Sequence, residues 1–271
     1  MPELPEVETV RRGIAPHLVG EEIDRMIIRQ RQLRWPISRT LPSAVANQHV
    51  HAVGRRAKYL LIGLARGHLI WHLGMSGSLR ALEDPSPPGP HDHVDVCLKN
   101  GTVLRFRDPR RFGSLHWTRA DPLRHRLLKD LGPEPLDGKF NGEWLYAKSR
   151  GRSGAVKNFL MDPRVVAGMG NIYASEALFE AGISPVRAAG RIGLNRYRRL
   201  AETTKAVLGR AIRAGGTTLK DFKKVEGEPG YFAQELQVYG RAGEACPRCG
   251  EPVRSRVIGQ RSSFYCQRCQ N

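Results

Sequence analysis

The sequence predicts an α+β protein, in which an N-terminal helix and an antiparallel β-sandwich precede a helical domain and a C-terminal zinc-binding β-hairpin. Three observations predict this class: apolar residues at helical spacing near the N-terminus, short β-rich runs between residues 23 and 117, and four cysteines near the C-terminus. A chain of 271 residues can bury one or two ordinary cores, so more than one domain is expected.

The N-terminal helix is expected to run from Pro5 to about Val19. Proline suits the first turn of a helix, and the carboxylates of Glu6 and Glu8 interact favourably with the positive end of the helix dipole. Four apolar residues at helical spacing give this helix one apolar face: Val7, Val10, Ile14 and Leu18.

Short β-rich runs follow the first helix and indicate strands. They are residues 50–53, 59–64, 68–73, 94–98 and 103–106. The last two flank Asn100 and Gly101, a pair that is typical of a tight hairpin turn. Regularly spaced strands with turn signals favour an antiparallel sandwich, against which we expect the first helix to pack.

A change in composition near Leu131 marks the start of the second domain. Residues 132–135 are Gly- and Pro-rich and indicate a connector, and helical patterns follow. The longest predicted helix spans residues 195–214 and stops at Gly215. The predicted domains are therefore residues 1–131, 132–240 and 241–271.

The charge balance predicts a polyanionic partner. Lysine and arginine total 44 against 26 acidic residues, a net charge of +18, and the positive groups recur along the whole chain. A basic surface that binds nucleic acid is the leading interpretation, and a merely soluble basic or ribosome-associated protein is the alternative. With no membrane-length apolar run and no secretory signal, we expect a cytoplasmic, nucleoid-associated protein.

Four of the five cysteines have the spacing of a two-knuckle zinc ribbon. Each pair can place two thiolates on one tetrahedral ion, and residues 253–265 between the pairs are long enough for a β-hairpin. A redox pair or accidental spacing is the alternative, although a cytosolic compartment disfavours disulfides. One structural Zn²⁺ is predicted, because four thiolates leave no position for water; its ligands are Cys246, Cys249, Cys266 and Cys269.

The opening of the chain, Pro2-Glu3-Leu4-Pro5-Glu6-Val7-Glu8-Thr9, resembles that of the formamidopyrimidine-DNA glycosylase family. The resemblance covers nearly the whole chain and implies a β-sandwich domain, a helix-two-turns-helix domain and a zinc ribbon. It also implies base excision DNA repair by a bifunctional glycosylase and abasic-site lyase. The other similar segments are residues 55–60, 72–77, 91–95, 108–113, 168–176, 215–219 and 231–236.

The resemblance makes Pro2 the nucleophile, and elementary chemistry supports that role. Removal of Met1 would expose a secondary amine, whose reference pKa near 8 lies far below the value of about 10.4 for lysine. Attack on the sugar C1′ would release the base and leave an iminium cation, an electron sink that permits elimination of both flanking phosphates. The alternative is that Pro2 merely begins a helix.

Four further residues receive catalytic roles from the resemblance. Glu3 would protonate the sugar oxygen during ring opening, and Glu6 would orient the site. Both could instead be acidic residues that favour a helix N-terminus. Lys58 would donate a proton during elimination, and Arg261 in the zinc hairpin would clamp phosphates and assist the second elimination. A solvated surface lysine is the alternative for Lys58.

Three residues match the family's wedge, which fills the gap left by an extruded base. Extrusion costs a few kcal/mol of stacking, which inserted side chains recover in part. Met75 and Phe112 would supply stacking bulk, while Arg110 would donate hydrogen bonds to the orphaned cytosine. The alternative places Met75 and Phe112 in the core of the sandwich, although Gly74 and Gly77 favour an exposed, tight loop.

The remaining predicted contacts lie along the DNA backbone and at the lesion. Asn171 begins a predicted helix whose first backbone N–H groups can bind a phosphate. His91 and Arg152 match further phosphate contacts, Lys157 would approach the damaged base, and the loop of residues 215–239 would cover it.

The expected partner is double-stranded DNA that contains oxidised bases or abasic sites, bound by a monomer. The expected substrates are oxidised purines, namely 8-oxoguanine and formamidopyrimidines. Two alternatives remain open: an endonuclease VIII-like glycosylase for oxidised pyrimidines, and a non-catalytic zinc-ribbon DNA-binding protein. The wedge residues and residues 215–239 favour the purine enzyme, and a non-catalytic protein would have no use for a free Pro2.

Overall fold

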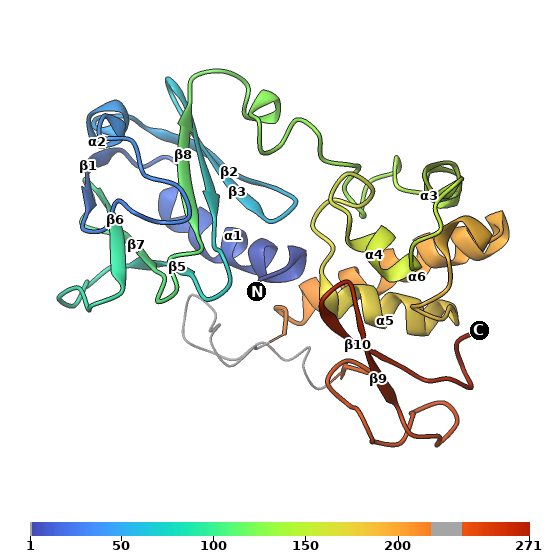
Figure 1. Ribbon diagram of the computed structural model, residues 1–271. Helices are drawn as coiled ribbons and strands as arrows, with labels where there is room; N and C mark the ends of the chain where they lie inside the picture. Colours follow the sequence, from blue (N-terminus) through green and yellow to red (C-terminus); the bar gives the residue numbers. More distant parts are fainter. Residues whose placement is uncertain (1, 218–234) are drawn as a thin grey trace. The chain divides into compact units, whose positions relative to one another are not determined.

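The computed structural model describes residues 2–217 and 235–271 (Figure 1). The chain divides into two compact units: unit 1 comprises Met1–Lys129 with Gly215–Tyr231, and unit 2 comprises Asp130–Ala214 with Phe232–Asn271. Residues 215–217, grouped with the helical domain in the sequence analysis, belong to unit 1 because Thr217 bonds to the first helix. Residues 218–234 of the predicted lesion-covering loop lie outside the described residues. The two predicted boundaries between the three domains, near residues 131 and 240, stay predictions.

In the described part of unit 1, eight antiparallel strands form two four-stranded sheets, as the predicted sandwich requires (Figure 1). One sheet has the order β1-β6-β7-β5 and the other the order β2-β3-β4-β8. The strands are β1 (Ile23–Ile28), β2 (Val50–Arg56), β3 (Tyr59–Leu64), β4 (Gly67–His72), β5 (Ser78–Leu82), β6 (Asp92–Leu98), β7 (Val103–Arg107) and β8 (Ser114–Thr118).

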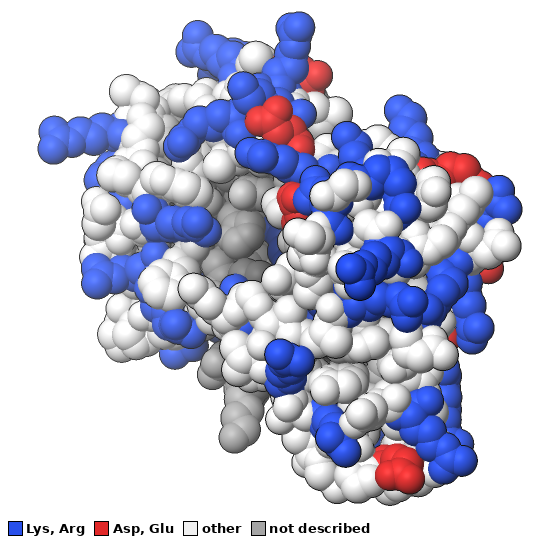
Figure 2. Space-filling view, turned by 45° about the vertical axis from the view of Figure 1, so that its right-hand side comes forward, with Lys and Arg blue, Asp and Glu red and all other residues white. Residues whose placement is uncertain are grey.

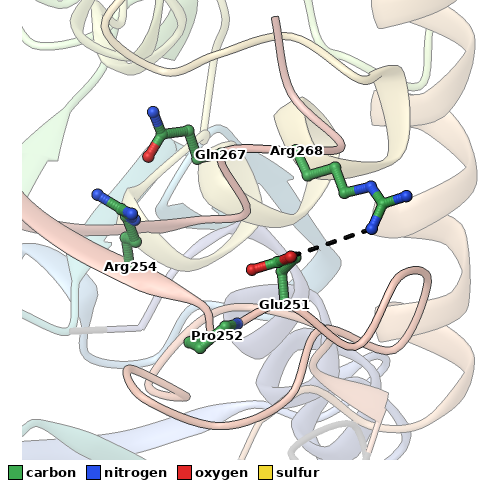
Figure 3. Close-up of a pocket in the computed structure, with 5 residues that line it drawn as sticks. All are labelled: Glu251, Pro252, Arg254, Gln267 and Arg268. Atoms are coloured by element: carbon green, nitrogen blue, oxygen red, sulfur yellow. Dashed lines mark ion pairs between the residues drawn. The ribbon is translucent and has the colours of Figure 1, made fainter.

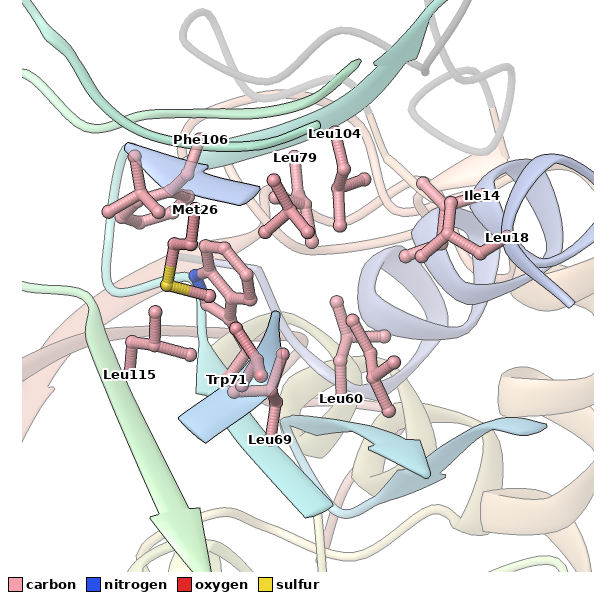
Figure 4. Close-up of a cluster of buried hydrophobic side chains, with 14 of the residues drawn as sticks. Ile14, Leu18, Met26, Leu60, Leu69, Trp71, Leu79, Leu104, Phe106 and Leu115 are labelled. Carbon is pink, nitrogen blue, oxygen red and sulfur yellow. The ribbon is translucent and has the colours of Figure 1, made fainter. Parts of the chain in front are cut away.

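Helix α1 (Leu4–Leu18) closes the space between these sheets, because it packs against β2 of one and β5 of the other. Ile14 and Leu18 reach the core from the helix, where Trp71 and Phe106 meet edge to face with ring centroids 5.3 Å apart (Figure 4). The apolar face of α1 therefore fixes the helix, and with it the N-terminus of the chain, to the sandwich. Short helices α2 (Leu41–Val45) and η1 (Pro122–Arg124) complete the unit.

Unit 2 is helical, as predicted, and its longest described helix, α6 (Leu194–Arg213), packs against α3 (Gly142–Ser149) and α5 (Asn171–Ala181). Helix α4 (Val156–Met161) contacts α5, and η2 (Ala189–Arg191) precedes α6. Helix α5 ends at Ala181 and is capped by Gly182, whose φ of +70° is favourable for glycine. Among the described residues, no helix has both the length and the apolar character needed to cross a membrane.

The C-terminal hairpin of unit 2 consists of β9 (Arg254–Ile258) and β10 (Arg261–Tyr265). Its two-residue turn, Gly259 and Gln260, has positive φ at both positions, which matches the right-handed twist of the strands. A Cβ on Gly259 would lie 2.4 Å from Oδ1 of Asn158 in α4, so the turn packs closely on that helix. Arg261 follows the turn directly.

Candidate active site

The predicted nucleophile and its acid lie at the start of α1. Pro2 and Glu3 are buried, and Glu3 is the N-cap of the helix. Its backbone N–H donates to Oε2 of Glu6 at 2.8 Å, as part of a capping box. The conformation of residues 2 and 3 is therefore fixed by a buried hydrogen bond and by a helix that is itself anchored in the core.

Glu6 also anchors residues from the other end of unit 1. Its Oε1 accepts from the backbone N–H of Thr217 at 2.9 Å and from the Thr217 hydroxyl at 3.0 Å. Gly216 has a φ of +79°, and a Cβ there would lie 2.9 Å from Oε1 of Glu6. Gly216 and Thr217 thus pack closely around the Glu6 carboxylate. Through this carboxylate the backbone of Glu3 is linked to Thr217.

Lys58 lies in the two-residue turn between β2 and β3, directly before the first residue of β3. Ala57, the other turn residue, has a φ of +52°. The guanidinium of Arg55 donates to the Ala57 carbonyl at 2.9 Å and to Glu8 of α1 at 3.1 Å. Arg55 therefore ties the Lys58 turn to the same helix that carries Pro2 and Glu3.

His72, which had no predicted role, lies at the end of β4, close enough to Lys58 to feel its charge. The backbone N–H of Gly74 donates to its Nδ1 at 3.0 Å, and the Tyr59 ring packs against it at a tilt of 54°, with the ring centroids 4.8 Å apart. Burial, together with the positive charges of Lys58 and Arg34, lowers the pKa of His72 to about 4. The neutral ring with Nδ1 as acceptor carries its proton on Nε2, so it is a hydrogen-bond donor without charge. Its position in the family-like segment 72–77 was the signal that could have identified it.

Because the pKa of His72 is lowered in the folded chain, we expect the free energy of unfolding to decrease in mild acid. An unfolded histidine titrates near pH 6.5, so below that pH the unfolded chain binds a proton that folded His72 does not. The free energy of unfolding should fall as the pH drops from about 6.5 to about 4, by up to about 1.4 kcal/mol per pH unit for this residue. Urea unfolding near pH 7 and near pH 5 measures the change.

A matched pair of variants isolates the contribution of His72. In His72→Asn the side-chain oxygen can still accept from Gly74 but does not titrate, so this variant should lose less stability between the two pH values than the original chain. His51→Asn replaces an exposed histidine and should leave the pH dependence as it is. Equal pH dependence in the original chain and in His72→Asn would refute the assignment.

The predicted wedge residues lie on two loops at the surface of unit 1. Phe112 is 43% exposed, which places it outside the sandwich core, and the Arg110 guanidinium stacks over its ring at 4.8 Å. Met75 is half-buried in the turn that Gly77 closes with a backbone hydrogen bond to Leu73. Exposed apolar side chains beside an arginine suit insertion between bases.

The other predicted DNA contacts of unit 1 and unit 2 are spread over several elements. His91 is half-buried just before β6, and its carbonyl accepts from the backbone N–H of Asp108 in the segment that carries the Arg110 loop. Arg152 is exposed in the loop before α4, where it pairs with Asp162 at 3.4 Å and stacks on Phe159. The structure does not bring Arg152 into the cluster formed by the other predicted residues of unit 2.

That cluster joins three predicted residues: Asn171 at the start of α5, Lys157 of α4 and Arg261 of β10. Nζ of Lys157 donates to Oδ1 of Asn171 at 2.5 Å, to Oγ of Ser263 at 2.5 Å and to the Ser262 carbonyl at 3.2 Å. Nδ2 of Asn171 donates to the same carbonyl at 2.9 Å. The side chain of Arg261 remains exposed beside this network.

Lys157 is thus placed differently from a lysine that reaches out to a damaged base. Its side chain is fully buried, with 0% exposure, and its ammonium points into hydrogen bonds with α5 and the zinc hairpin. A buried ammonium needs several acceptors to offset its desolvation, and these three supply them. In this arrangement Lys157 holds elements together.

The four C-terminal cysteines form a metal site of the predicted kind. Their Sγ atoms all lie within 4.8 Å of one another, with Cys246 and Cys269 3.9 Å apart and Cys249 and Cys266 3.5 Å apart. A tetrahedral zinc site with Zn–S distances of about 2.3 Å places its sulfurs about 3.8 Å apart. The sulfur positions therefore fit one Zn²⁺ ion.

Positive side chains dominate the molecular face in Figure 2, where Lys and Arg outnumber Asp and Glu. Not every basic cluster is available to an anion, however. A pocket in the zinc ribbon is lined by Arg254, Gln267 and Arg268, but also by Glu251, whose carboxylate lies 4.0 Å from Arg268 and places a negative charge in the pocket (Figure 3). This pocket does not extend the candidate site.

Comparison with known proteins identifies one family along the chain, the family that the sequence resembles. Residues 1–115 match the formamidopyrimidine-DNA glycosylase N-terminal domain, residues 131–223 match the corresponding H2TH domain, and residues 243–271 match the zinc finger found in FPG and IleRS. Formamidopyrimidine-DNA glycosylase from Nitrosococcus oceani is 59% identical over 271 residues, with complete coverage of both chains. The protein of that name from Stenotrophomonas maltophilia is 57% identical over 270 residues, also with complete coverage.

Solved structures give the same result. The MutM (FPG) protein from Thermus thermophilus superimposes with a TM-score of 0.89 at 38% identity, covering 99% of this chain and 98% of that one. A Lactococcus lactis FPG mutant in complex with DNA containing Fapy-dG superimposes with a TM-score of 0.92 at 31% identity over the whole of both chains. The chain belongs to the formamidopyrimidine-DNA glycosylase family.

Proposed function

We propose that this enzyme removes oxidised purines, namely 8-oxoguanine and formamidopyrimidines, from duplex DNA and then cuts the strand, with the imino group of Pro2 as nucleophile. Its family works in base excision DNA repair as a glycosylase with abasic-site lyase activity. The observation that carries the proposal is the full-length match to proteins of this name, combined with a core-anchored helix that begins at Leu4, directly after Pro2 and its N-cap Glu3.

The proposed reaction begins with attack of the Pro2 nitrogen on C1′ of the damaged nucleotide. The glycosidic bond breaks, the base leaves with a proton, and Glu3 protonates the sugar ring oxygen so that the ring opens to an iminium ion. Loss of a proton from C2′ then expels the 3′-phosphate, and a second elimination expels the 5′-phosphate. Lys58 is proposed to supply a proton during elimination, and Arg261 to bind a flanking phosphate.

We assign Glu6 an orienting role because its two carboxylate oxygens hold Glu3 and Thr217. A group that accepts three hydrogen bonds from fixed donors is poorly suited to shuttle a proton, since each transfer would break some of them. The backbone of Glu3 is fixed by this carboxylate, so Glu6 would align the acid and the adjacent nucleophile.

The proposed DNA contacts divide into wedge and backbone groups. Met75, Arg110 and Phe112 would fill the gap left by the extruded base, which their place on adjoining loops and the exposure of Phe112 support. His91, Arg152 and Asn171 would bind phosphates, with Asn171 assisted by the N–H groups at the start of α5. The structure favours Lys157 as a support for Asn171 and the hairpin rather than as a direct contact with the base.

The zinc ribbon holds one structural Zn²⁺ ion through Cys246, Cys249, Cys266 and Cys269. Duplex DNA with a lesion or an abasic site is the proposed partner, in line with the Lactococcus lactis complexes with Fapy-dG DNA and with abasic DNA. We further propose that the enzyme acts as a monomer in the cytoplasm, at the nucleoid.

Borohydride trapping on two duplexes tests this function. We expect a covalent complex with 8-oxoguanine opposite cytosine, because reduction of the iminium ion fixes the chain to the sugar, and little complex with thymine glycol. Gel electrophoresis measures both products. Trapping with thymine glycol alone would indicate an oxidised-pyrimidine enzyme, and trapping with neither duplex would indicate a non-catalytic DNA-binding protein.

A further inference from the structure

We propose that Asp108 is a positioning residue that holds the two wedge loops in a single arrangement before DNA binds. The Met75 loop comprises residues 73–77, and the Phe112 loop comprises residues 109–113. The inference rests on the proposed function, since it concerns how the wedge is prepared for insertion. Asp108 itself is fully buried, with 0% exposure, so it does not touch DNA.

The Asp108 carboxylate joins the two loops through one oxygen each. Oδ1 accepts from the hydroxyl of Ser76 at 3.1 Å, and Oδ2 accepts from the backbone N–H of Gly113 at 2.8 Å. Ser76 directly follows Met75, and Gly113 directly follows Phe112. The carboxylate therefore fixes the residue adjacent to each apolar wedge side chain.

The backbone of Asp108 makes further contacts that fix its own position. Its carbonyl accepts from Nε2 of His93 at 2.8 Å and from the backbone N–H of Arg111 at 3.2 Å, while its N–H donates to the His91 carbonyl at 3.0 Å. These bonds tie the start of the Phe112 loop to the segment that begins β6. Asp108 therefore connects both loops to the same part of the sandwich, the start of β6.

Two glycines allow the loops to meet backbone to backbone. A Cβ on Gly74 would lie 2.4 Å from the backbone nitrogen of Gly113 and 2.5 Å from the carbonyl carbon of Phe112. A Cβ on Gly113 would lie 2.9 Å from the His72 carbonyl oxygen. Only residues without a side chain permit this approach, so the two loops form a single packed unit with Asp108 beneath it.

A prepared wedge has a direct advantage for base extrusion. Apolar side chains that are ordered only on binding lose conformational freedom at that moment, which subtracts from the binding energy available to unstack the base. Asp108 orders the backbone of both loops in advance, and the stacking of Arg110 on Phe112 orders the exposed side chains. Loss of the Asp108 carboxylate should therefore slow extrusion and leave the chemistry at Pro2 intact.

Four variants and two substrates test this role under single-turnover conditions. Asp108→Ala removes both bonds, and Asp108→Asn can restore them, because its oxygen can accept from Gly113 while its NH₂ donates to the Ser76 hydroxyl. Phe112→Ala removes a wedge side chain directly and shows how much excision is lost when the wedge itself is damaged. Asp121→Ala is the matched control, since it removes an exposed aspartate whose carboxylate likewise accepts from a backbone N–H, that of Leu123 at 2.9 Å.

The substrates separate extrusion from chemistry. One is a duplex with 8-oxoguanine opposite cytosine, and the other is a single strand with a preformed abasic site, which offers no base to extrude and no paired stack to fill. We expect Asp108→Ala to lower excision from the duplex by roughly tenfold to a hundredfold, as misplaced active-site groups do, with cleavage of the single strand nearly unchanged. Asp108→Asn and Asp121→Ala should resemble the original chain on both substrates.

The outcomes are distinguishable. Equal losses of Asp108→Ala on both substrates would show a general folding defect and overturn the proposal, as would an unchanged rate on the duplex. A duplex-selective loss in Phe112→Ala without one in Asp108→Ala would keep the wedge and reject the positioning role. An original chain that cleaves neither substrate would instead refute the proposed function.

Discussion

A Pro2→Gln variant, which retains Met1 because glutamine is too large for removal of the initiator residue, should lose base excision and strand cleavage together. We expect a loss of at least about a thousandfold, the scale on which removal of an enzyme's nucleophile acts. The nitrogen of residue 2 would be an amide, whose lone pair is delocalised into the carbonyl, so it could neither attack C1′ nor form an iminium ion. The free amine would instead belong to Met1, one residue before position 2, and so would no longer stand at the place of the nucleophile.

The fold of the variant should survive, because the capping box of α1 involves Glu3 and Glu6 and leaves residue 2 outside the helix. Single-turnover cleavage of the 8-oxoguanine duplex measures the effect, and mass spectrometry of the intact chain verifies that Met1 is present. Binding to a duplex with an uncleavable abasic analogue should change little.

Pro2→Gly supplies the matched control for this experiment. Glycine permits removal of Met1 and leaves a primary amine at the same position, so this variant should still be trapped by borohydride, although its iminium ion can lose an N–H proton and sustain elimination less well. A chain that keeps Met1 and still nicks damaged DNA at full rate would contradict the mechanism.

Features that depend on residues close in sequence were predicted well. The first helix, expected from Pro5 to about Val19, runs from Leu4 to Leu18, and the helix expected over residues 195–214 runs from Leu194 to Arg213. The spacing of apolar residues and a glycine at the helix end are local features of the sequence. They therefore predict a helix without knowledge of the tertiary structure. The four zinc cysteines were also found from their spacing, and their sulfurs do meet.

Strands at sheet edges were harder to predict. β5 (Ser78–Leu82) and β8 (Ser114–Thr118) each follow a wedge loop and lie at the edge of a sheet, where only part of each strand is buried. For β1 (Ile23–Ile28), which also lies at the edge of its sheet, the sequence pattern predicted no first and last residue. The alternation of apolar and polar residues is weak in such short edge strands, and their pairing depends on distant partners.

The supports of the site could not be predicted because they join distant residues. Glu6 and Thr217 are 211 positions apart, and Lys157 and Ser263 are 106 positions apart. The family resemblance placed Lys157 near the damaged base, whereas the fold buries it and surrounds it with acceptors from α5 and β10. Similarity to a family identifies residues that touch DNA more readily than residues such as Asp108 that hold them.

Removal of zinc should have the second large effect, which we expect to reach beyond the ribbon. The ribbon's apolar cluster is small, consisting of Phe179, Val238, Val253 and the partly buried Phe264 with the zinc cysteines, and β9 is almost wholly exposed. Zinc binding to such modules contributes on the order of 10–16 kcal/mol, so a small core of this kind cannot replace the metal. We expect the hairpin to unfold in a chelator and in the Cys266→Ser variant.

The consequence for DNA binding follows from the contacts of the hairpin with α4 and α5. Unfolding removes Ser262 and Ser263, which accept from the buried Lys157 ammonium and orient Asn171, and it releases Arg261 from its fixed place. Each hydrogen bond to a charged group contributes about 1.5–3 kcal/mol, so loss of the bonds from Lys157 to Ser262 and Ser263 should loosen the start of α5 as well. Affinity for the abasic-analogue duplex should therefore fall by at least about a hundredfold, more than the loss of one phosphate contact explains.

Fluorescence anisotropy with that duplex measures the affinity, and metal analysis of the same samples gives the zinc content. Cys97→Ser is the matched control, because it changes the one cysteine that lies in β6, away from the metal ligands, and should keep both zinc and affinity. Zinc added back to the chelated chain should restore binding, whereas Cys266→Ser should not recover. If the zinc-depleted chain bound the duplex as tightly as the loaded chain, the ribbon would be a passive appendage and Arg261 could not be a phosphate clamp.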